Sequence, residues 1–507
     1  MFMKTFQSLL VAGIFSMLMM TCGKDQNVKM YKAFTSMKLN DTLITEAVED
    51  EISYHPEVPV NEINVKTEDN IVILSGTTDN LLAKNRAEEV ASQVIGVKGI
   101  INHIVVRPDS VTDDELLKRV EGGLYYDPTT NLWQMKVKVK NGNVFLSGQV
   151  NSWEEIQFAG DVAESIRGVK SVTNDLTFKY DSLRPDEQIY YDIKRIFLTD
   201  ARLDHTLIDV KVDTGAVELW GIVGSLPEKS LAISDAWVDG VKSVDASNLE
   251  VKYWARDPRL RLNKYAAKPD SEIISSIQTA LYYDYRVNDY DVNVDANGGY
   301  VKLTGTVTNL QAKNAAGEDA NNIVGVWSVD NMIKIQPNAE YSDNNVLGRV
   351  KAAFKNDPYL KKYDLKLNVF NGRLYIEGMV DSPYEKILAE KLGERIPGVT
   401  DIKDNLTVSG FYNQYSNKYY KYNNYPVFEE PKLLPDNKIL TNIEHEFWKS
   451  PFLNGDEIAV DVRDGHVTLT GKVETYLEKK LATKEAYEGG AFTVTNDIRV
   501  MYWPHKR

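Results

Sequence analysis

A short alternating block that ends in glycine occurs six times in this chain, and it constrains the fold more than any other feature. The blocks read IVILSG, NVFLSG, AVELWG, YVKLTG, RLYIEG and HVTLTG, and they end at Gly76, Gly148, Gly221, Gly305, Gly378 and Gly471. A residue with an oxygen-bearing side chain follows each glycine after four positions, and alanine follows each after eleven. A pattern repeated at this spacing indicates a tandem array of one small structural unit.

Each position in the repeat has a physical interpretation. The alternating block predicts a β-strand, and Asn141-Gly142 predicts a tight hairpin turn that joins one such strand to the strand before it. The glycine at the end of the block predicts a bulge or a close approach of two backbones. The oxygen side chain four residues later suits the start of a helix. The buried face of that helix is expected to carry the alanine, because a small side chain lets the helix lie close to the sheet.

These elements, with an amphipathic helix upstream of each hairpin, predict an α+β fold class. The chain is expected to be a tandem array of small α-β-β-α-β units, each a three-stranded mixed sheet covered on one face by two helices. The short joints between units favour an elongated arrangement. The expected repeats are residues 41–107, 112–180, 185–254, 269–337, 342–410 and 435–504, with a Tyr/Asn-rich linker at 411–434.

The N-terminus indicates export and a lipid anchor. Lys4 precedes an apolar run from Leu9 to Met20, which suits a signal peptide over residues 1–21. The run ends beside Cys22, the one cysteine of the chain, and so resembles a bacterial lipoprotein signal in which that cysteine is acylated. The alternative is an ordinary secretory signal with an incidental cysteine. Gly23-Lys24-Asp25 resembles the surface-export signal of some Gram-negative lipoproteins, or is simply a polar tether.

The repeat itself resembles the BON domain. The α-β-β-α-β order, the strand ending in Leu-Ser/Thr-Gly, and a later Val-x-Asn at Val172-Thr173-Asn174 and Val329-Asp330-Asn331 carry the resemblance. Repeats three and five depart from it, with Ala246 and Asp404 in place of the asparagine. The resemblance implies association with the cell envelope and, in several members, with phospholipid surfaces or protection against envelope stress.

Composition and motifs exclude several other functions. The formal net charge of −14 argues against sequence-independent nucleic-acid binding, which depends on Lys and Arg contacts to phosphate. A single cysteine and six histidines without an i, i+4 pair predict no metal site. Asp291, Asp295 and Asn297 lack the spacing of a calcium loop and are better explained by a turn. We expect no cofactor and no enzymatic activity.

Two groups of residues are candidate membrane or partner contacts. Lys136, Lys138 and Lys140 alternate along one strand and so share one face, as a cationic stripe or as a solvated edge guarded against aggregation. Aromatic residues also end several of the first helices, namely Tyr126, Tyr283 and Trp448. They suit a membrane interface or a protein contact, or else they pack against a neighbouring repeat.

Two functions remain in view. The first is an outer-membrane lipoprotein, on the periplasmic face or the cell surface, that binds phospholipid or envelope components in envelope maintenance or stress protection. The alternative is a lipid-tethered scaffold or chaperone-like adaptor for envelope proteins, without direct lipid recognition. The family resemblance favours the first function, whereas the acidic net charge favours the second.

Overall fold

Each glycine-ended block forms the central strand of its own small sheet in the computed structural model, which describes residues 40–59, 62–130, 132–178, 184–256, 268–287, 291–408 and 434–501. The central strands are β2 Ile71–Thr78, β5 Asn143–Val150, β8 Ala216–Val223, β11 Tyr300–Val307, β15 Arg373–Val380 and β18 His466–Val473. The antiparallel strands before them are β1 Ile63–Glu68, β4 Met135–Lys140, β7 Ile208–Asp213, β10 Val292–Asn297, β14 Lys366–Phe370 and β17 Ile458–Arg463.

A parallel strand completes each sheet on the other side. These strands are β3 Gly99–Val106, β6 Ser171–Phe178, β9 Ser243–Val251, β12 Ser328–Asn331 with β13 Lys334–Ile335, β16 Asp401–Val408 and β19 Thr493–Val500. Every sheet is therefore mixed, with the glycine-ended strand in the middle and the first strand at an edge.

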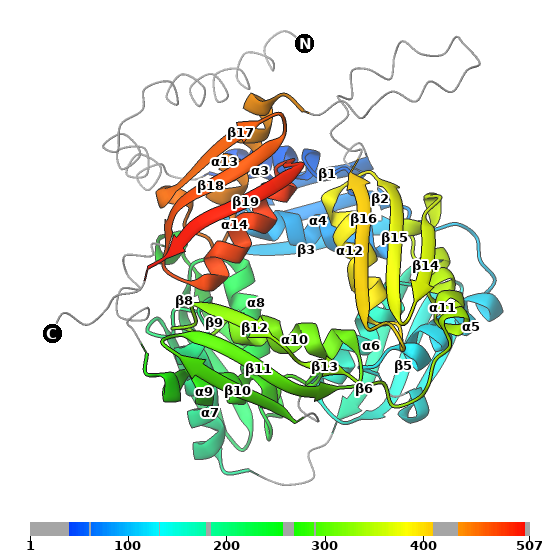
Figure 1. The fold of residues 1–507 in the computed structure, drawn as a ribbon, viewed down its shortest axis with the longest axis horizontal. Helices are drawn as coiled ribbons and strands as arrows, with labels where there is room; N and C mark the ends of the chain where they lie inside the picture. The colour runs from blue at the N-terminus through cyan, green and yellow to red at the C-terminus, as the bar shows by residue number, and fades with distance from the viewer. Residues whose placement is uncertain are drawn as a thin grey trace, which may run out of the picture. The chain divides into compact units, whose positions relative to one another are not determined.

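Two helices accompany each sheet. The first helices are α3 Asp41–Ser53, α5 Asp113–Tyr126, α7 Asp186–Thr199, α9 Asp270–Tyr283, α11 Asp343–Asn356 and α13 Asp436–Lys449. The second helices are α4 Leu81–Gln93, α6 Trp153–Glu164, α8 Leu226–Asp235, α10 Leu310–Asn321, α12 Pro383–Glu394 and α14 Tyr476–Glu488. The helices cover one face of each sheet (Figure 1), so the predicted fold class of tandem α-β-β-α-β units is confirmed.

The second helix begins where the sequence predicts. The residue four positions after each glycine is the N-cap, and its side-chain oxygen accepts a backbone N–H from the first turn at Asn80, Ser152, Ser225, Asn309, Ser382 and Thr475. The alanine at the eleventh position is fully buried in every repeat, at Ala87, Ala159, Ala232, Ala316, Ala389 and Ala482. The N-cap therefore fixes where the second helix begins, and the buried alanine lets this helix pack closely on its sheet.

The first helix is tied to the hairpin by an aspartate that stands at the same place in every repeat and that the sequence analysis did not single out. In repeat 2, the Asp113 carboxylate accepts the backbone N–H of Asn141 at 2.7 Å and that of Gly142 at 2.9 Å. The same two-oxygen contact recurs at Asp41, Asp186, Asp270, Asp343 and Asp436. Because this carboxylate accepts the backbone N–H groups of both turn residues, it holds the first turn of the helix against the hairpin turn.

The strand-ending glycine allows a close backbone approach, as predicted. Gly148 has φ +138°, and a Cβ there would lie 2.3 Å from the carbonyl oxygen of Gln134. We expect Gly148→Ala to lower the free energy of unfolding by about 1–3 kcal/mol, the usual cost of a non-glycine residue in such a conformation. Gly122→Ala is the matched control, because a Cβ added to that helical glycine would meet no heavy atom within 4 Å. The control should raise stability by about 0.8–1 kcal/mol. Chemical denaturation of both variants measures the difference, and equal effects would contradict the clash.

The elongated arrangement expected from the short joints is not what the structure shows. The described residues from Asp41 onward form one compact unit, in which repeats far apart in sequence contact each other. Tyr359 of repeat 5 donates to the Glu57 carbonyl of repeat 1 at 3.0 Å, and Trp327 of repeat 4 donates to the Val500 carbonyl of repeat 6 at 3.0 Å. A short joint limits only the relative position of the two repeats that it connects. The helices of each repeat can still pack on repeats that are distant in the sequence.

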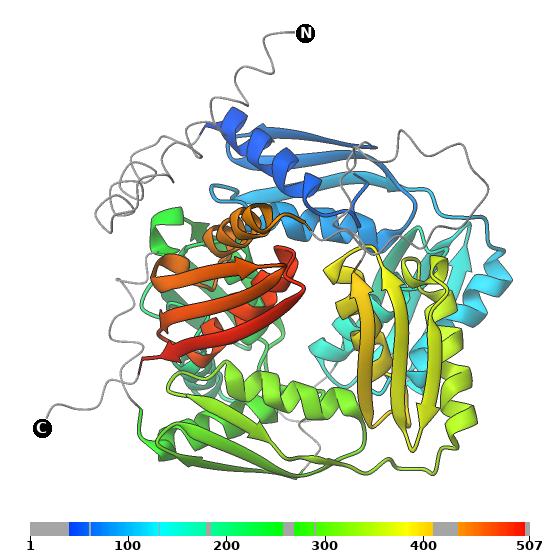
Figure 2. The ribbon, with the colours of Figure 1, turned by 45° about the horizontal axis from the view of Figure 1, so that its top comes forward.

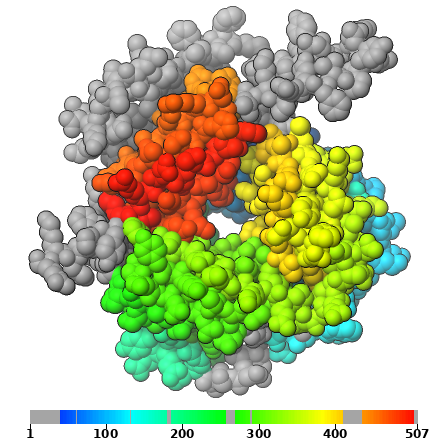
Figure 3. All heavy atoms as spheres, viewed as in Figure 1, coloured from blue at the N-terminus to red at the C-terminus, as the bar shows by residue number. Residues whose placement is uncertain are grey.

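The first helices meet in pairs from different repeats. Helices α7 and α9 of repeats 3 and 4 pack together. In the 2–5 pair the Arg349 guanidinium lies 4.8 Å from the Tyr126 ring centroid, and in the 1–6 pair His445 bonds to Glu51 at 2.9 Å. The second helices α10, α12 and α14 also contact one another in series, whereas the sheets they carry turn their other faces outward (Figures 1 and 2). Figure 3 shows repeats 4, 5 and 6 meeting around a narrow opening on this face.

Candidate functional site

The outer face of the repeat 2 sheet and the turn before its edge strand carry exposed basic and aromatic side chains. Strand β4 is an edge strand, and Lys136, Lys138 and Lys140 are all exposed on it, as the sequence predicts. Lys138 pairs across the sheet with Phe145 of β5, whose side chain is 37% exposed. Directly before β4, in the 3₁₀ turn η2 Leu132–Gln134, Trp133 is 88% exposed. We call these five residues the repeat 2 basic face.

Trp133 is the residue of this face that the sequence pattern did not single out. The aligned place before the first strand holds Thr206 in repeat 3 and Asp456 in repeat 6, but tyrosine in repeats 4 and 5, at Tyr290 and Tyr363. Aromatic residues therefore recur at this position, so Trp133 does not stand out in the sequence. The exposure of Trp133 could not be predicted from the sequence, because it requires that η2 is not covered by another repeat.

Three lysines on one edge strand occur in no other described sheet, but repeat 5 also combines an exposed lysine with an exposed aromatic ring, at Lys366 and Phe370 of β14, and Phe370 is 65% exposed. Repeat 1 has an apolar outer face, with Ile71, Ile101 and Val105 exposed. On repeat 3 the exposed positions of β7 are Asp209, Lys211 and Asp213, so charges of both signs alternate. The stripe of three lysines is therefore particular to repeat 2 among the described sheets, whereas exposed basic and aromatic side chains also occur together on repeat 5.

The three helix-end aromatics lie in different surroundings. Tyr126 is partly exposed beneath the Arg349 guanidinium of repeat 5. Tyr283 packs against the core of repeat 3, and its hydroxyl donates to Asp192 at 2.7 Å. Trp448 is 41% exposed, with its ring 6.1 Å from that of His445. The structure thus places Tyr126 and Tyr283 at contacts between repeats and Trp448 beside His445 of its own repeat, and it does not bring these side chains together with the lysines.

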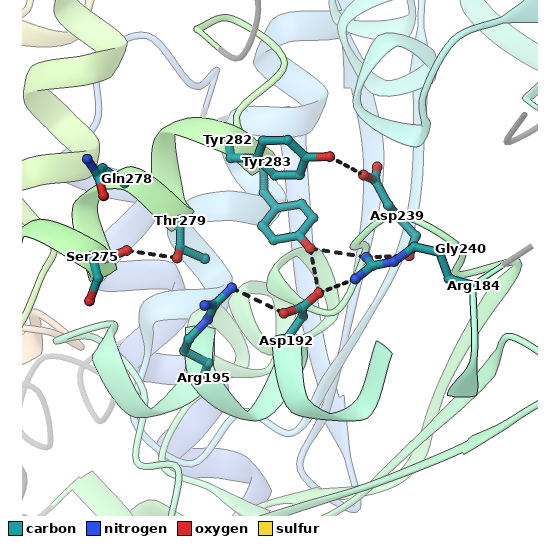
Figure 4. Close-up of a pocket in the computed structure, with 10 residues that line it drawn as sticks. All are labelled: Arg184, Asp192, Arg195, Asp239, Gly240, Ser275, Gln278, Thr279, Tyr282 and Tyr283. Atoms are coloured by element: carbon teal, nitrogen blue, oxygen red, sulfur yellow. Dashed lines mark hydrogen bonds and ion pairs between the residues drawn. The ribbon is translucent and has the colours of Figure 1, made fainter. Parts of the chain in front are cut away.

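A cavity of about 800 Å³ lies beside Tyr283, between α7 and α9 (Figure 4). Its lining includes Arg184, Asp192 and Arg195 from repeat 3 and Thr279 and Tyr282 from repeat 4. Burial favours the neutral form of Asp192, but hydrogen bonds from Arg184 and Tyr283 and the charges of both arginines outweigh it and hold its pKa below the ordinary value. The carboxylate is therefore ionised and is an acceptor for all three neighbours.

A buried ionic cluster joins the first and last repeats. Glu51 of α3 accepts from His55 at 3.2 Å, from His445 at 2.9 Å and from Lys449 of α13. Burial alone would raise the pKa of Glu51, yet these hydrogen bonds and the Lys449 charge hold it well below its ordinary value. Arg86 pairs with Glu57 at 3.0 Å in the same cluster. Every one of these charges has an opposite partner, as a buried ion requires.

Three carboxyl groups beside this cluster also lie close together, in Glu446, Glu485 and Glu488, with oxygens within 4.8 Å of one another. Lys449 pairs with Glu446 at 2.8 Å, and Ser450 donates to Glu485 at 3.0 Å. Burial and the charge of Glu488 raise the pKa of Glu485 to about 8, whereas the pKa of Glu488 is lowered. One proton is therefore held on Glu485 at neutral pH.

This proton gives a pH-dependent prediction. The pKa of Glu485 in the folded protein lies above its unfolded value of about 4.5. The protonated Glu485 therefore contributes fully to the free energy of unfolding below pH 4.5, and this contribution is lost as the pH rises toward 8. Glu485→Gln mimics the protonated form and cannot titrate. We therefore expect the stability of the wild type relative to this variant to fall between pH 5 and 8 and then level off. Thermal unfolding of both proteins across this range measures it, and parallel curves would contradict the assignment.

Two predicted features lie outside the described residues, namely Cys22 with its signal peptide and nearly all of the 411–434 linker. Among the residues that are described, no helix is both long enough and apolar enough to cross a membrane.

Comparison with known proteins explains the repeat. The model of the BON domain matches residues 40–108, 112–180, 185–253, 269–337, 342–410 and 435–502. This chain belongs to the BON domain family. The asparagine of the family's Val-x-Asn motif has a clear role here, because Asn174 donates to the Ile156 carbonyl of α6 at 2.7 Å and so ties the last strand to the second helix.

Two curated relatives each match a little more than a quarter of this chain. Osmotically-inducible protein Y of Escherichia coli is 30% identical over 148 residues, which are 28% of this chain and 74% of that protein. Outer membrane lipoprotein DolP of Haemophilus influenzae is 28% identical over 152 residues, 29% of this chain and 77% of that protein. A solved structure of CdsD, a structural protein of the type III secretion system of Chlamydia trachomatis, matches 44% of this chain and 93% of its own at 16% identity and a TM-score of 0.12. That value supports no structural argument.

Proposed function

We propose that this chain is a non-enzymatic lipoprotein of the cell envelope, anchored through Cys22 in the outer membrane, whose BON repeat 2 binds phospholipid surfaces. The observation that carries the proposal is the 88% exposure of Trp133 in the turn directly before β4, the strand that bears three exposed lysines. Membership of the BON family and the relatives named for osmotic induction and for an outer membrane lipoprotein support an envelope role under stress.

The chemistry of the face suits a lipid headgroup region. Tryptophan has an apolar body with one polar N–H, and it is enriched where a membrane meets water. Lysine keeps its charge in water while its stem covers apolar surface. Each lysine near an anionic lipid surface contributes about 1 kcal/mol. Three lysines on one edge strand therefore contribute about 3 kcal/mol to the free energy of binding an anionic membrane.

Edge protection alone does not account for this face. Lysines on an edge strand do prevent edge-to-edge aggregation, but an exposed tryptophan and a half-exposed Phe145 work against that purpose. The net charge of −14 is spread over the chain. Repulsion between these charges and an anionic membrane is screened beyond about 8 Å at physiological ionic strength. The local charge of the repeat 2 basic face therefore decides its contact with a membrane.

Vesicle flotation tests the proposal. The protein is the chain beginning at Gly23, which lacks the acylated cysteine, and the vesicles are neutral or anionic at low and moderate salt. We expect co-flotation with anionic vesicles that weakens as salt increases. Absence of flotation under all conditions would overturn direct lipid recognition. The chain would then be a tethered scaffold or adaptor for envelope proteins.

A further inference from the structure

The cavity between α7 and α9 exists because α9 presents short polar side chains toward it. Ser275 and Thr279 line it, together with the exposed amide of Gln278. In repeat 6 the residue aligned with Thr279 is His445, whose ring lies 5.4 Å from Tyr54 of the paired repeat. A large side chain thus occupies the position in the 1–6 pair that is small in the 3–4 pair. The resulting 800 Å³ falls within the range of about 300–1,000 Å³ typical of small-molecule sites.

The far wall of the cavity is held in place by a hydrogen-bond network (Figure 4). The Asp192 carboxylate accepts from Arg184 at 2.6 Å, from Tyr283 at 2.7 Å and from Arg195 at 3.1 Å. Arg184 also donates to the Asp239 carbonyl at 3.1 Å. Side chains fixed in this way lose little further freedom when a ligand binds, which favours recognition.

The charges that line the cavity cancel. Arg184 and Arg195 are balanced by Asp192 and Asp239, so an anion such as phosphate meets no net positive charge. What the lining offers is a mixture of donors and acceptors in guanidinium, carboxylate, amide and hydroxyl groups. A ligand that both donates and accepts at many points matches this mixture, and sugar hydroxyl groups do so.

One aromatic ring completes the chemistry. Tyr282 is 57% exposed, and its hydroxyl donates to Asp239 at 2.9 Å, so the orientation of the ring is fixed. The apolar C–H face of a pyranose packs on such a ring while its hydroxyls reach the polar groups. We propose that this cavity binds a neutral carbohydrate. The site is distinct from the repeat 2 basic face and extends the envelope role from lipid to glycan.

The test is a binding titration of the chain from Gly23 by calorimetry, with triacetylchitotriose and cellotriose as neutral probes and inorganic phosphate as the anionic probe. We expect at least one oligosaccharide to bind and phosphate not to bind. Tyr282→Ala and Gln278→Ala should each weaken that binding about fivefold to tenfold. Neither change should alter vesicle flotation, so failure here is distinguishable from failure of the lipid proposal.

Matched controls come from α7. Tyr191 is 61% exposed and makes an edge contact with Tyr190, just as Tyr282 does with Tyr283, but it does not line the cavity. Gln188 is an exposed glutamine on the same helix that is also absent from the lining. Tyr191→Ala and Gln188→Ala should leave binding unchanged. Binding of neither oligosaccharide, equal losses in the control variants, or binding of phosphate alone would each overturn the proposal.

Discussion

Glu51→Ala is expected to lower the free energy of unfolding by about 3–5 kcal/mol, the largest effect expected of any single substitution proposed for this chain. The Lys449 side chain is only 4% exposed and pairs with Glu51. Removing the carboxylate leaves a buried ammonium with Glu446 as its remaining partner. It also removes the acceptor shared by His55 and His445. Urea denaturation followed by circular dichroism measures the loss.

An exposed ion pair provides the control for this prediction. Lys66 and Glu68 lie on β1 with most of their side chains in solvent. Glu68→Ala should change stability by less than about 1 kcal/mol, because exposed pairs contribute little. If Glu51→Ala cost no more than the control, the first and last repeats would not depend on this cluster for their contact.

The second large effect concerns lipid binding. Replacing Lys136, Lys138 and Lys140 together by glutamine is expected to weaken binding to anionic vesicles about 100-fold. This follows from about 1 kcal/mol for each lysine near the surface and 1.4 kcal/mol for each factor of ten. The fold should be unaffected, because all three side chains are exposed. Sedimentation with vesicles of increasing anionic content measures the change.

A charge-matched control separates local from global electrostatics. Lys211, Lys302 and Lys403 are exposed on the sheets of three other repeats, so their replacement by glutamine changes the net charge equally. We expect at most a small loss of binding in this variant. Equal losses in the two triple variants would show that net charge governs the interaction and that repeat 2 has no special part in it.

Local features of the fold could be predicted from the sequence because they are repeated and short in range. The caps at Ser152 and Thr475 and the close approach at Gly148 depend on neighbours within one unit. Asp113 was not singled out, although an aspartate recurs 35 residues before every strand-ending glycine, at Asp41, Asp113, Asp186, Asp270, Asp343 and Asp436. The order of helices and strands and the recurrence of this aspartate are therefore visible in the sequence, whereas its contact with a turn 28 residues away is not.

Contacts between repeats could not be predicted from the sequence. The Glu51–Lys449 pair joins positions that are 398 residues apart. The spacing of hydrophobic residues along the chain does not indicate which distant charged residues will pair. The same limit applies to the candidate sites. The lysine stripe is visible in sequence because strands alternate, but the exposure of Trp133 and the cavity beside Tyr283 depend on how whole repeats pack.

The most direct test of the central claim is quenching of tryptophan fluorescence by brominated phospholipid in the mature chain. The wild type is compared with Trp133→Phe, using anionic vesicles. Because Trp133 is 88% exposed in the turn directly before the strand that bears the lysines, we predict clear quenching in the wild type and a large part of it lost in the variant. Identical quenching in the two proteins, or none in the wild type, would contradict insertion of the repeat 2 basic face into the lipid surface.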